Sequence, residues 1–489
     1  MKYRLAGVLA AAAMLGAVLL LSAMLPENAE TRVHQHLTSR GPDAGCDCDG
    51  GELCTHLPLV LIDTQGEEIP GEPIGTSSGG PDLGFTLTED GEAMLSAHIS
   101  VIWGDDSNHH PSDEPDLESE MLIRVRGNSS RYYDKKGYLI RLTDEDGSYR
   151  NEEMMGMDAH YEWALHGPYL DKTLIRNYMW YNIAGEIMDY APNVRFCEVM
   201  VNGEYKGVYV MTETITNGED ARLNISEPID GTTKTGYALR LDRGSSNELK
   251  NITTFTNFSL RSLMQMNIVY PRSGSLTEEL AGAIEQDFSD FEKALYSYDY
   301  DTDDYGYDQW IDAGSFADYF IINEFTTNYD AGWLSTYLYK DIGGKYKMVI
   351  WDFNSACDNY TESTMSPQHF EMQNCVWYYM LLKDETFVAR IIDRYRELRE
   401  TILSDDALAA YIDETIDYLG PAVGRNFEVW GYTFSEYRPL RPEDRNPEDH
   451  EEAVKQLKEF IYNRGAWMDA YIDTLQQYCH ESKVKKFNH

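Results

Sequence analysis

The chain is 489 residues long and strongly acidic, with 41 Lys and Arg against 83 Asp and Glu and a formal net charge of −42 at pH 7. That charge repels the phosphates of nucleic acids and anionic lipid surfaces, so no nucleic-acid partner is expected. The length leaves room for two or three units around a large core, and the mixture of helical and strand-like segments predicts an α+β architecture.

The first residues predict a membrane segment. After a short basic stretch, Leu5 to Leu25 forms a run of 21 uncharged, mostly apolar residues, which is long enough to cross a bilayer as a helix. Because the run is longer than the core of an ordinary signal peptide, we interpret residues 1–29 as an uncleaved signal anchor; cleavage near Ala29 is the alternative. By the positive-inside rule, the rest of the chain then lies outside the cytoplasm.

Residues 30–90 are interpreted as a linker with a cysteine-containing segment. Cys46, Cys48 and Cys54 lie close together in it, and the chain has seven cysteines, so at least one thiol stays unpaired. Together with His56, the three thiols could bind zinc. The spacing is unusual for structural zinc, however, and a local disulfide or ordinary loop chemistry is the favoured interpretation.

A second possible metal site is the acidic loop at residues 104–120, which holds His109 and His110. Paired histidines among carboxylates can bind a metal ion. A solvated loop is the more common outcome and is the favoured interpretation here.

A short apolar run predicts a strand at 57–62, and alternating apolar residues predict one at 97–103; a pair of strands is expected at 121–125 and 137–142. The last two strands flank a turn rich in small and basic residues. Such a turn can offer hydrogen-bond donors and positive charge to phosphate groups, although a basic, solvated turn is the favoured interpretation from the residues alone. The candidate phosphate-binding residues are Arg126, Asn128, Ser129, Ser130, Lys136 and Arg141.

The middle of the chain predicts a helix at 171–188, a hairpin of strands 195–201 and 207–211 around an Asn-Gly turn, and a strand at 236–242. Glu213 follows the hairpin. It could contact a nucleotide base or cap the next turn.

Two aspartates lie at the two ends of one predicted hairpin. An apolar helix at 316–325 leads to Asp330; strands at 336–340 and 346–351 follow, and the second strand ends on Asp352. Because a hairpin folds back on itself, the two carboxylates are expected to lie near each other. The pair suits phosphoryl transfer, in which one Asp deprotonates a hydroxyl and the other holds a metal ion on the phosphates. The alternative is that each Asp caps a helix or closes a turn.

The motif NYD, followed by this hairpin and WDFN, resembles the CotH family of spore-coat-type protein kinases. Four more blocks resemble that family in its order: RGNSS at 126–130, KKGYLIRL at 135–142, DKTLIRN at 171–177 and GVYVMTE at 207–213. The resemblance covers roughly residues 90–470 and implies an atypical protein-kinase-like fold with a β-rich N-terminal lobe and a mostly helical C-terminal lobe. It also implies that a serine of a surface or spore-coat protein is phosphorylated with ATP and Mg²⁺ or Mn²⁺.

On this basis Asp330 is expected to be the catalytic base, Asp352 and Asn354 the metal ligands, and Glu213 a residue of the nucleotide site. Two departures count against activity: Ser335 stands where a protein kinase carries its second metal-binding Asn, and Asn354 replaces an Asp that many relatives have. A non-catalytic, surface-anchored binding or structural protein is therefore the alternative; a metal-dependent hydrolase is less favoured because the hairpin has no histidine.

The expected divisions are 1–29 (anchor), 30–90 (linker), 91–365 (kinase-like core) and 366–489 (helical subdomain).

Overall fold

The computed structural model describes residues 46–75, 84–104, 107–218, 221–243, 249–255 and 264–482. The membrane helix predicted at residues 5–25 lies outside these ranges. Within them, no helix is long and apolar enough to cross a membrane.

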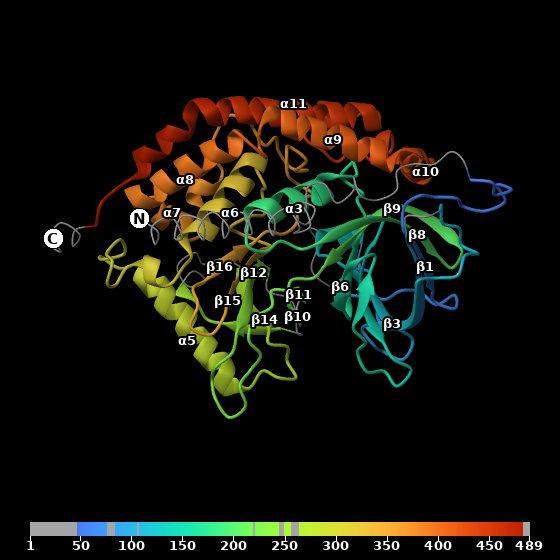
Figure 1. Ribbon diagram of the computed structural model, residues 1–489, viewed down its shortest axis with the longest axis horizontal. Helices are drawn as coiled ribbons and strands as arrows, with labels where there is room; N and C mark the ends of the chain where they lie inside the picture. The colour runs from blue at the N-terminus through green and yellow to red at the C-terminus, as the bar shows by residue number, and fades with distance from the viewer. Residues whose placement is uncertain are drawn as a thin grey trace, which may run out of the picture.

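Seven strands form a closed barrel in the order β1-β2-β3-β4-β7-β9-β8 (Figure 1). All neighbouring pairs are antiparallel except β1 and β8, whose parallel pairing closes the barrel. Buried and exposed residues alternate along β3, and the buried set fills the interior. The strands are β1 (Leu59–Asp63), β2 (Leu95–Ile102), β3 (Leu117–Arg126), β4 (Gly137–Thr143), β7 (Glu162–His166), β8 (Val194–Val201) and β9 (Glu204–Glu213).

A separate sheet of five strands has the order β13-β14-β12-β15-β16. Its strands are β12 (Tyr237–Arg243), β13 (Lys250–Ile252), β14 (Met264–Tyr270), β15 (Thr336–Lys340) and β16 (Lys347–Val349). Two short hairpins complete the described strands: β5 (Glu152–Met154) with β6 (Met157–His160), and β10 (Asn217–Gly218) with β11 (Ala221–Arg222).

Helices cover one side of both sheets, with α11 outermost at the top of Figure 1. Helices α8 and α11 pack on α6, and α10 packs on β9. One hydrophobic core joins α3, α5, α6 and the C-terminal helices to the five-stranded sheet. The helices are α3 (Arg176–Ile187), α5 (Glu278–Leu295), α6 (Ala313–Thr326), α7 (Tyr378–Leu381), α8 (Glu385–Arg399), α9 (Asp405–Leu419), α10 (Pro421–Trp430) and α11 (His450–Tyr471), with short 3₁₀ turns η2 (Ser129–Tyr132), η3 (Tyr307–Gln309), η4 (Met372–Asn374), η5 (Gly431–Phe434), η6 (Glu443–Arg445) and η7 (Ile472–Tyr478).

The predicted α+β class is confirmed, but the predicted two-lobe, kinase-like arrangement is wrong. The strands expected in a β-rich lobe close into a barrel, because β1, from the segment interpreted as part of a linker, pairs in parallel with β8. Hydrophobic periodicity predicts where strands occur but does not indicate which strands pair. The closure of the barrel could therefore not be predicted from the sequence.

Candidate active site

The ends of three strands converge at one edge of the five-stranded sheet. Strand β12 pairs antiparallel with β15, with Leu241 opposite Thr336, and β15 pairs antiparallel with β16, with Tyr337 opposite Val349. The last residues of β12 and β16 therefore lie beside the first residues of β15. This edge gathers Asp242 from the end of β12, Asp330 from the loop before β15, and Asp352 from just after β16.

The carboxylates of Asp330 and Asp352 interact with each other. Burial, together with the negative charge of Asp352, raises the pKa of Asp330 to about 7. Burial and the charge of Asp242 also raise the pKa of Asp352, while the nearby guanidinium of Arg126 acts in the opposite direction. The site thus concentrates negative charge in a poorly solvated place, which favours binding of a proton or a cation.

Helix α3 holds the backbone around Asp352. The amide of Asp352 donates to the Tyr181 hydroxyl at 3.0 Å, and the amide of Phe353 donates to Asn177 Oδ1 at 2.7 Å. Asp352 has a φ of 59°, in the left-handed region that few residues other than glycine adopt. The carboxylate also accepts a hydrogen bond from the amide of Asn354, so its direction is set by its own turn.

Asp330 lies in the turn that follows α6. That helix ends at Thr326 and is capped by Thr327, which has a left-handed φ of 46°. The carbonyl of Asp330 accepts hydrogen bonds from the amides of Trp333 and Leu334. Two residues before it, Asn328 is buried, and its Oδ1 has no hydrogen-bond partner among the described residues. The turn therefore presents a carboxylate and leaves a buried carbonyl oxygen unsatisfied.

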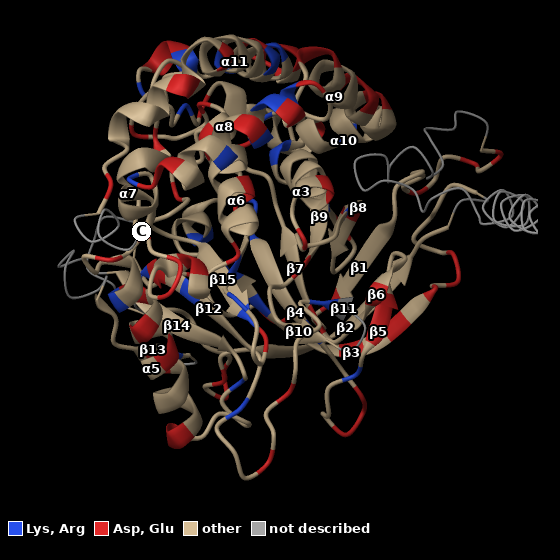
Figure 2. Cartoon of the chain, turned by 60° about the vertical axis from the view of Figure 1, so that its left-hand side comes forward, with Lys and Arg blue, Asp and Glu red and all other residues tan. Residues whose placement is uncertain are grey.

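Arg126 brings the β3–β4 hairpin to this edge. Its guanidinium carbon lies 5.5 Å from the centre of the Trp351 ring, and its charge favours the ionised form of Asp352. The predicted strand pair is confirmed, with Arg126 opposite Gly137. Figure 2 shows Lys and Arg positions on β12 and β15, while Asp and Glu positions are spread over many other parts of the ribbon.

A comparison with known protein families covers the region that holds this edge. The family described as CotH kinase protein matches residues 123–468, which is more than half of the chain. The chain belongs to the CotH family. It is also similar to the inner spore coat protein H of Bacillus subtilis (strain 168), with 21% identity over 398 residues that cover 76% of this chain and 93% of that protein.

Within this CotH protein, the predicted phosphate-binding turn is rigidly built. Gly127 has a φ of 109°, and a Cβ there would lie 1.8 Å from Ser130 Oγ, so only glycine fits. Arg131 donates to the carbonyl of Gly127 at 2.6 Å and to that of Gly71 at 2.7 Å, and Lys136 Nζ donates to the carbonyl of Arg131 at 2.8 Å. Lys136 therefore supports the turn, while Asn128 and Ser129 are exposed at its tip.

Two other residues predicted for the nucleotide site have partners elsewhere in the CotH chain. Arg141 donates to Glu162 at 2.8 Å, and Glu162 is buried. Glu213 is buried too, and accepts hydrogen bonds from the amide of Asn193 at 2.8 Å and from its Nδ2 at 3.2 Å. Neither residue is among the neighbours that shift the pKa of Asp330 or Asp352. Their roles towards a nucleotide stay predictions.

Sequence reasoning missed Asp242, Arg243 and Tyr181. The strand ending at Asp242 was predicted, but its pairing with β15, which places it at the site, was not. Arg243 lowers the pKa of Asp330. The available signal was the pair of charged residues at the end of the predicted strand, at 242–243.

Proposed function

We propose that this CotH protein is a metal-dependent protein serine kinase. The observation that carries the proposal is the pair of half-buried, interacting carboxylates at Asp330 and Asp352, with the Arg126 guanidinium acting on Asp352. Phosphoryl transfer depends on positioning and on neutralising charge, and these residues supply a base, a cation ligand and a fixed positive charge.

The residues at this edge fit a hard divalent cation such as Mg²⁺ or Mn²⁺. Such ions prefer carboxylate and amide oxygens, and the pKa values of Asp330 and Asp352 are raised by burial and by neighbouring negative charge that a cation would neutralise. Asp352 would hold the ion, with Asn354 as the second predicted ligand and Asp242 close enough to influence Asp352 electrostatically. When bound, the ion would neutralise charge on the ATP phosphates.

Asp330 would accept the proton of the serine hydroxyl. A general base works best when its pKa lies near the working pH, and burial with the charge of Asp352 raises the pKa of Asp330 to about 7. Arg126 and the exposed Asn128 and Ser129 would contact the phosphates. The relative's name suggests that the substrate is a spore-coat or surface protein and that the protein works in the spore envelope.

A non-catalytic binding role is the second candidate. It is favoured because Arg141, Lys136 and Glu213 form hydrogen bonds with other residues of the protein. Among the predicted nucleotide-site residues, Arg126 is then the cation that contacts the carboxylate edge. A triphosphate would then be held weakly unless a metal ion contributes.

Calorimetric titration of the full chain with ATP, in the presence of Mg²⁺, Mn²⁺ or a chelator, separates the two candidates. The kinase proposal expects binding that requires the metal, and transfer of labelled γ-phosphate to a serine-containing protein or to the chain itself. Absence of nucleotide binding with every divalent metal would leave the non-catalytic role; binding without transfer would indicate a pseudokinase.

A further inference from the structure

Three thiols and one imidazole form a compact cluster on the barrel, outside the carboxylate edge. One ligand atom from each of Cys46, Cys48, Cys54 and His110 lies within 4.8 Å of all the others. Cys46 Sγ and His110 Nε2 are 3.5 Å apart. All four residues precede residue 123, where the family match begins, so the cluster is a feature of this chain outside the matched region.

The spacing of these atoms fits a tetrahedral zinc ion. Zinc lies about 2.3 Å from a thiolate sulfur and about 2.0 Å from an imidazole nitrogen, which places neighbouring ligand atoms of a tetrahedron about 3.5–3.8 Å apart. The distance from Cys46 Sγ to His110 Nε2 already falls in that range. The other distances between ligand atoms are at most 4.8 Å, so small side-chain movements would bring all four atoms to tetrahedral spacing.

Neighbouring groups orient the ligands. The Asp113 carboxylate lies 3.2 Å from His110 Nδ1 and accepts from the backbone amide of His110 at 2.8 Å, which directs Nε2 towards the thiols. Asn108 Nδ2 donates to Cys54 Sγ at 3.1 Å, a contact that helps to fix the position of the sulfur. A carboxylate behind a histidine ligand is the usual second layer of a zinc site.

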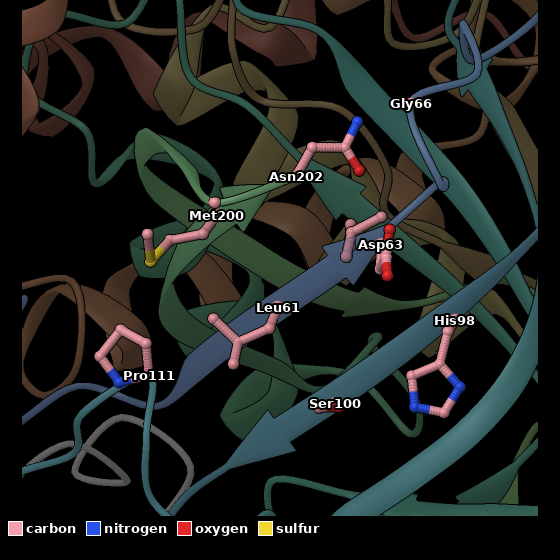
Figure 3. A pocket seen from close by; sticks show the side chains of 10 residues that line it. Leu61, Asp63, Gly66, His98, Ser100, Pro111, Met200 and Asn202 are labelled. Atoms are coloured by element: carbon pink, nitrogen blue, oxygen red, sulfur yellow. The ribbon is translucent and has the colours of Figure 1, made fainter.

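The two segments that contribute ligands are already joined. Thr55 and His109 exchange backbone hydrogen bonds of 3.1 and 2.7 Å, and Ser112 Oγ donates to Glu52 at 2.6 Å. Pro111, the residue after His110, lies beside Leu61 of β1 in a hollow on the barrel (Figure 3). The cluster thus lies where the segment before β1 meets the β2–β3 loop.

The histidine in the cluster is not His56, the one considered from the sequence. His56 Nε2 lies 2.5 Å from the carbonyl of Tyr418, and its ring packs edge-on against the Tyr418 ring at 5.4 Å. His56 therefore anchors the segment to α9. His110, 56 residues after Cys54 in the chain, takes the fourth place in the cluster.

We propose that Cys46, Cys48, Cys54 and His110 bind one Zn²⁺ ion as a structural site that fastens the segment before β1 to the β2–β3 loop. Four protein ligands and soft thiolates favour zinc in a structural role over a hard cation. Binding displaces the protons of the thiols and leaves the oxidation state of sulfur unchanged. The segment at 46–58 has little regular secondary structure, so a metal crosslink would restrict it further than these hydrogen bonds do.

The metal content of the full chain, purified without a histidine tag under reducing conditions, is the first measurement. We expect about one zinc per chain by mass spectrometry of the metal, and, after exchange with Co²⁺, the absorption bands of tetrahedral thiolate coordination. Cys48→Ser and His110→Ala should each lower zinc retention after dialysis at least about tenfold. Cys479→Ser, which alters a thiol far from the cluster in the sequence, is the matched control and should keep the metal.

A second measurement tests the structural role without depending on the folding of a variant. Zinc-loaded wild-type protein should resist proteolysis between residues 46 and 58, and a chelator should expose that segment while the rest of the chain stays resistant. The proposal is overturned if reduced wild-type protein binds neither Zn²⁺ nor Co²⁺, if non-reducing mass analysis shows a disulfide within the cluster in the purified protein, or if the chelator leaves cleavage unchanged.

Discussion

Arg464 of α11 and Glu324 of α6 form an ion pair in which neither side chain is exposed to solvent. The guanidinium also donates to the carbonyls of Pro367 at 2.9 Å and His369 at 2.6 Å, and the carboxylate accepts from the amide of Met372 at 2.7 Å. The pair therefore links the C-terminal helix to the helix that leads directly to Asp330.

Replacing one member of this pair should strongly destabilise the protein. Arg464→Met leaves the Glu324 carboxylate buried without its partner, and we expect a loss of about 3–5 kcal/mol in the free energy of unfolding. Lys455→Met, which removes an exposed ion pair on the same helix, should change it by less than about 1 kcal/mol. Urea unfolding followed by circular dichroism measures the free energy of unfolding of both variants. If Arg464→Met lost as little as Lys455→Met, the buried pair would contribute little to stability.

Asp352→Ala should abolish metal-dependent ATP binding and leave the fold intact. The packing here comes from the buried Val349, Ile350 and Phe353, so the loss in stability should stay within about 0.5–3 kcal/mol. Calorimetric titration with ATP and Mg²⁺ or Mn²⁺ tests the claim, with the exposed Asp308→Asn as control. Unchanged metal-dependent binding in Asp352→Ala would remove this residue from the metal site.

Asp330→Asn should separate binding from transfer. The amide cannot accept the serine proton, so phosphate transfer should fall by at least about 10²-fold, while ATP binding with the metal persists. Labelled-phosphate transfer and calorimetry on the same preparation give the two readouts. A variant that transfers phosphate at the wild-type rate would show that another group serves as base.

Arg126→Ala should weaken ATP binding by about tenfold or more, because it removes the guanidinium that approaches Asp352 and packs on Trp351. Arg150→Ala is the matched control, since Arg150 pairs with Glu152 on the short β5 strand. Titration with ATP and metal compares them. Equal affinity in the two variants would place the phosphates away from the hairpin end.

The stability of the metal-free protein should depend on pH through Asp330. Because burial and the charge of Asp352 raise the pKa of Asp330 from 3.8 to about 7, the folded state holds a proton that the unfolded state has lost between these values. This group's contribution is fully favourable below pH 4 and is lost as the pH rises through about 7.

Asp330→Asn cannot lose a proton at this position. In chelator-treated samples it should therefore gain about 1–3 kcal/mol over wild type at pH 8, with the gain shrinking towards pH 5. Urea unfolding at the two pH values measures this, and Asp308→Asn is the control. If the difference in the free energy of unfolding between Asp330→Asn and wild type did not change with pH, the Asp330 carboxylate would be solvated.

The sequence by itself determined the local elements and the family. The Asn-Gly turn at 202–203 fixed a hairpin because both residues adopt left-handed backbone angles there, and alternating apolar residues marked β2, β3 and β12. The NYD and WDFN motifs identified the family, and the hairpin between them placed Asp330 and Asp352 together, because two ends of one hairpin must be neighbours.

Only the tertiary structure decided which distant segments meet. The parallel pairing of β1 with β8 closed the barrel, the pairing of β12 with β15 brought Asp242 to the site, and the β2–β3 loop supplied His110 to the cysteines in place of His56. Each depends on contacts between residues far apart in the chain. Such contacts are selected by the packing of the whole core. Local periodicity and turn chemistry therefore carry no information about them.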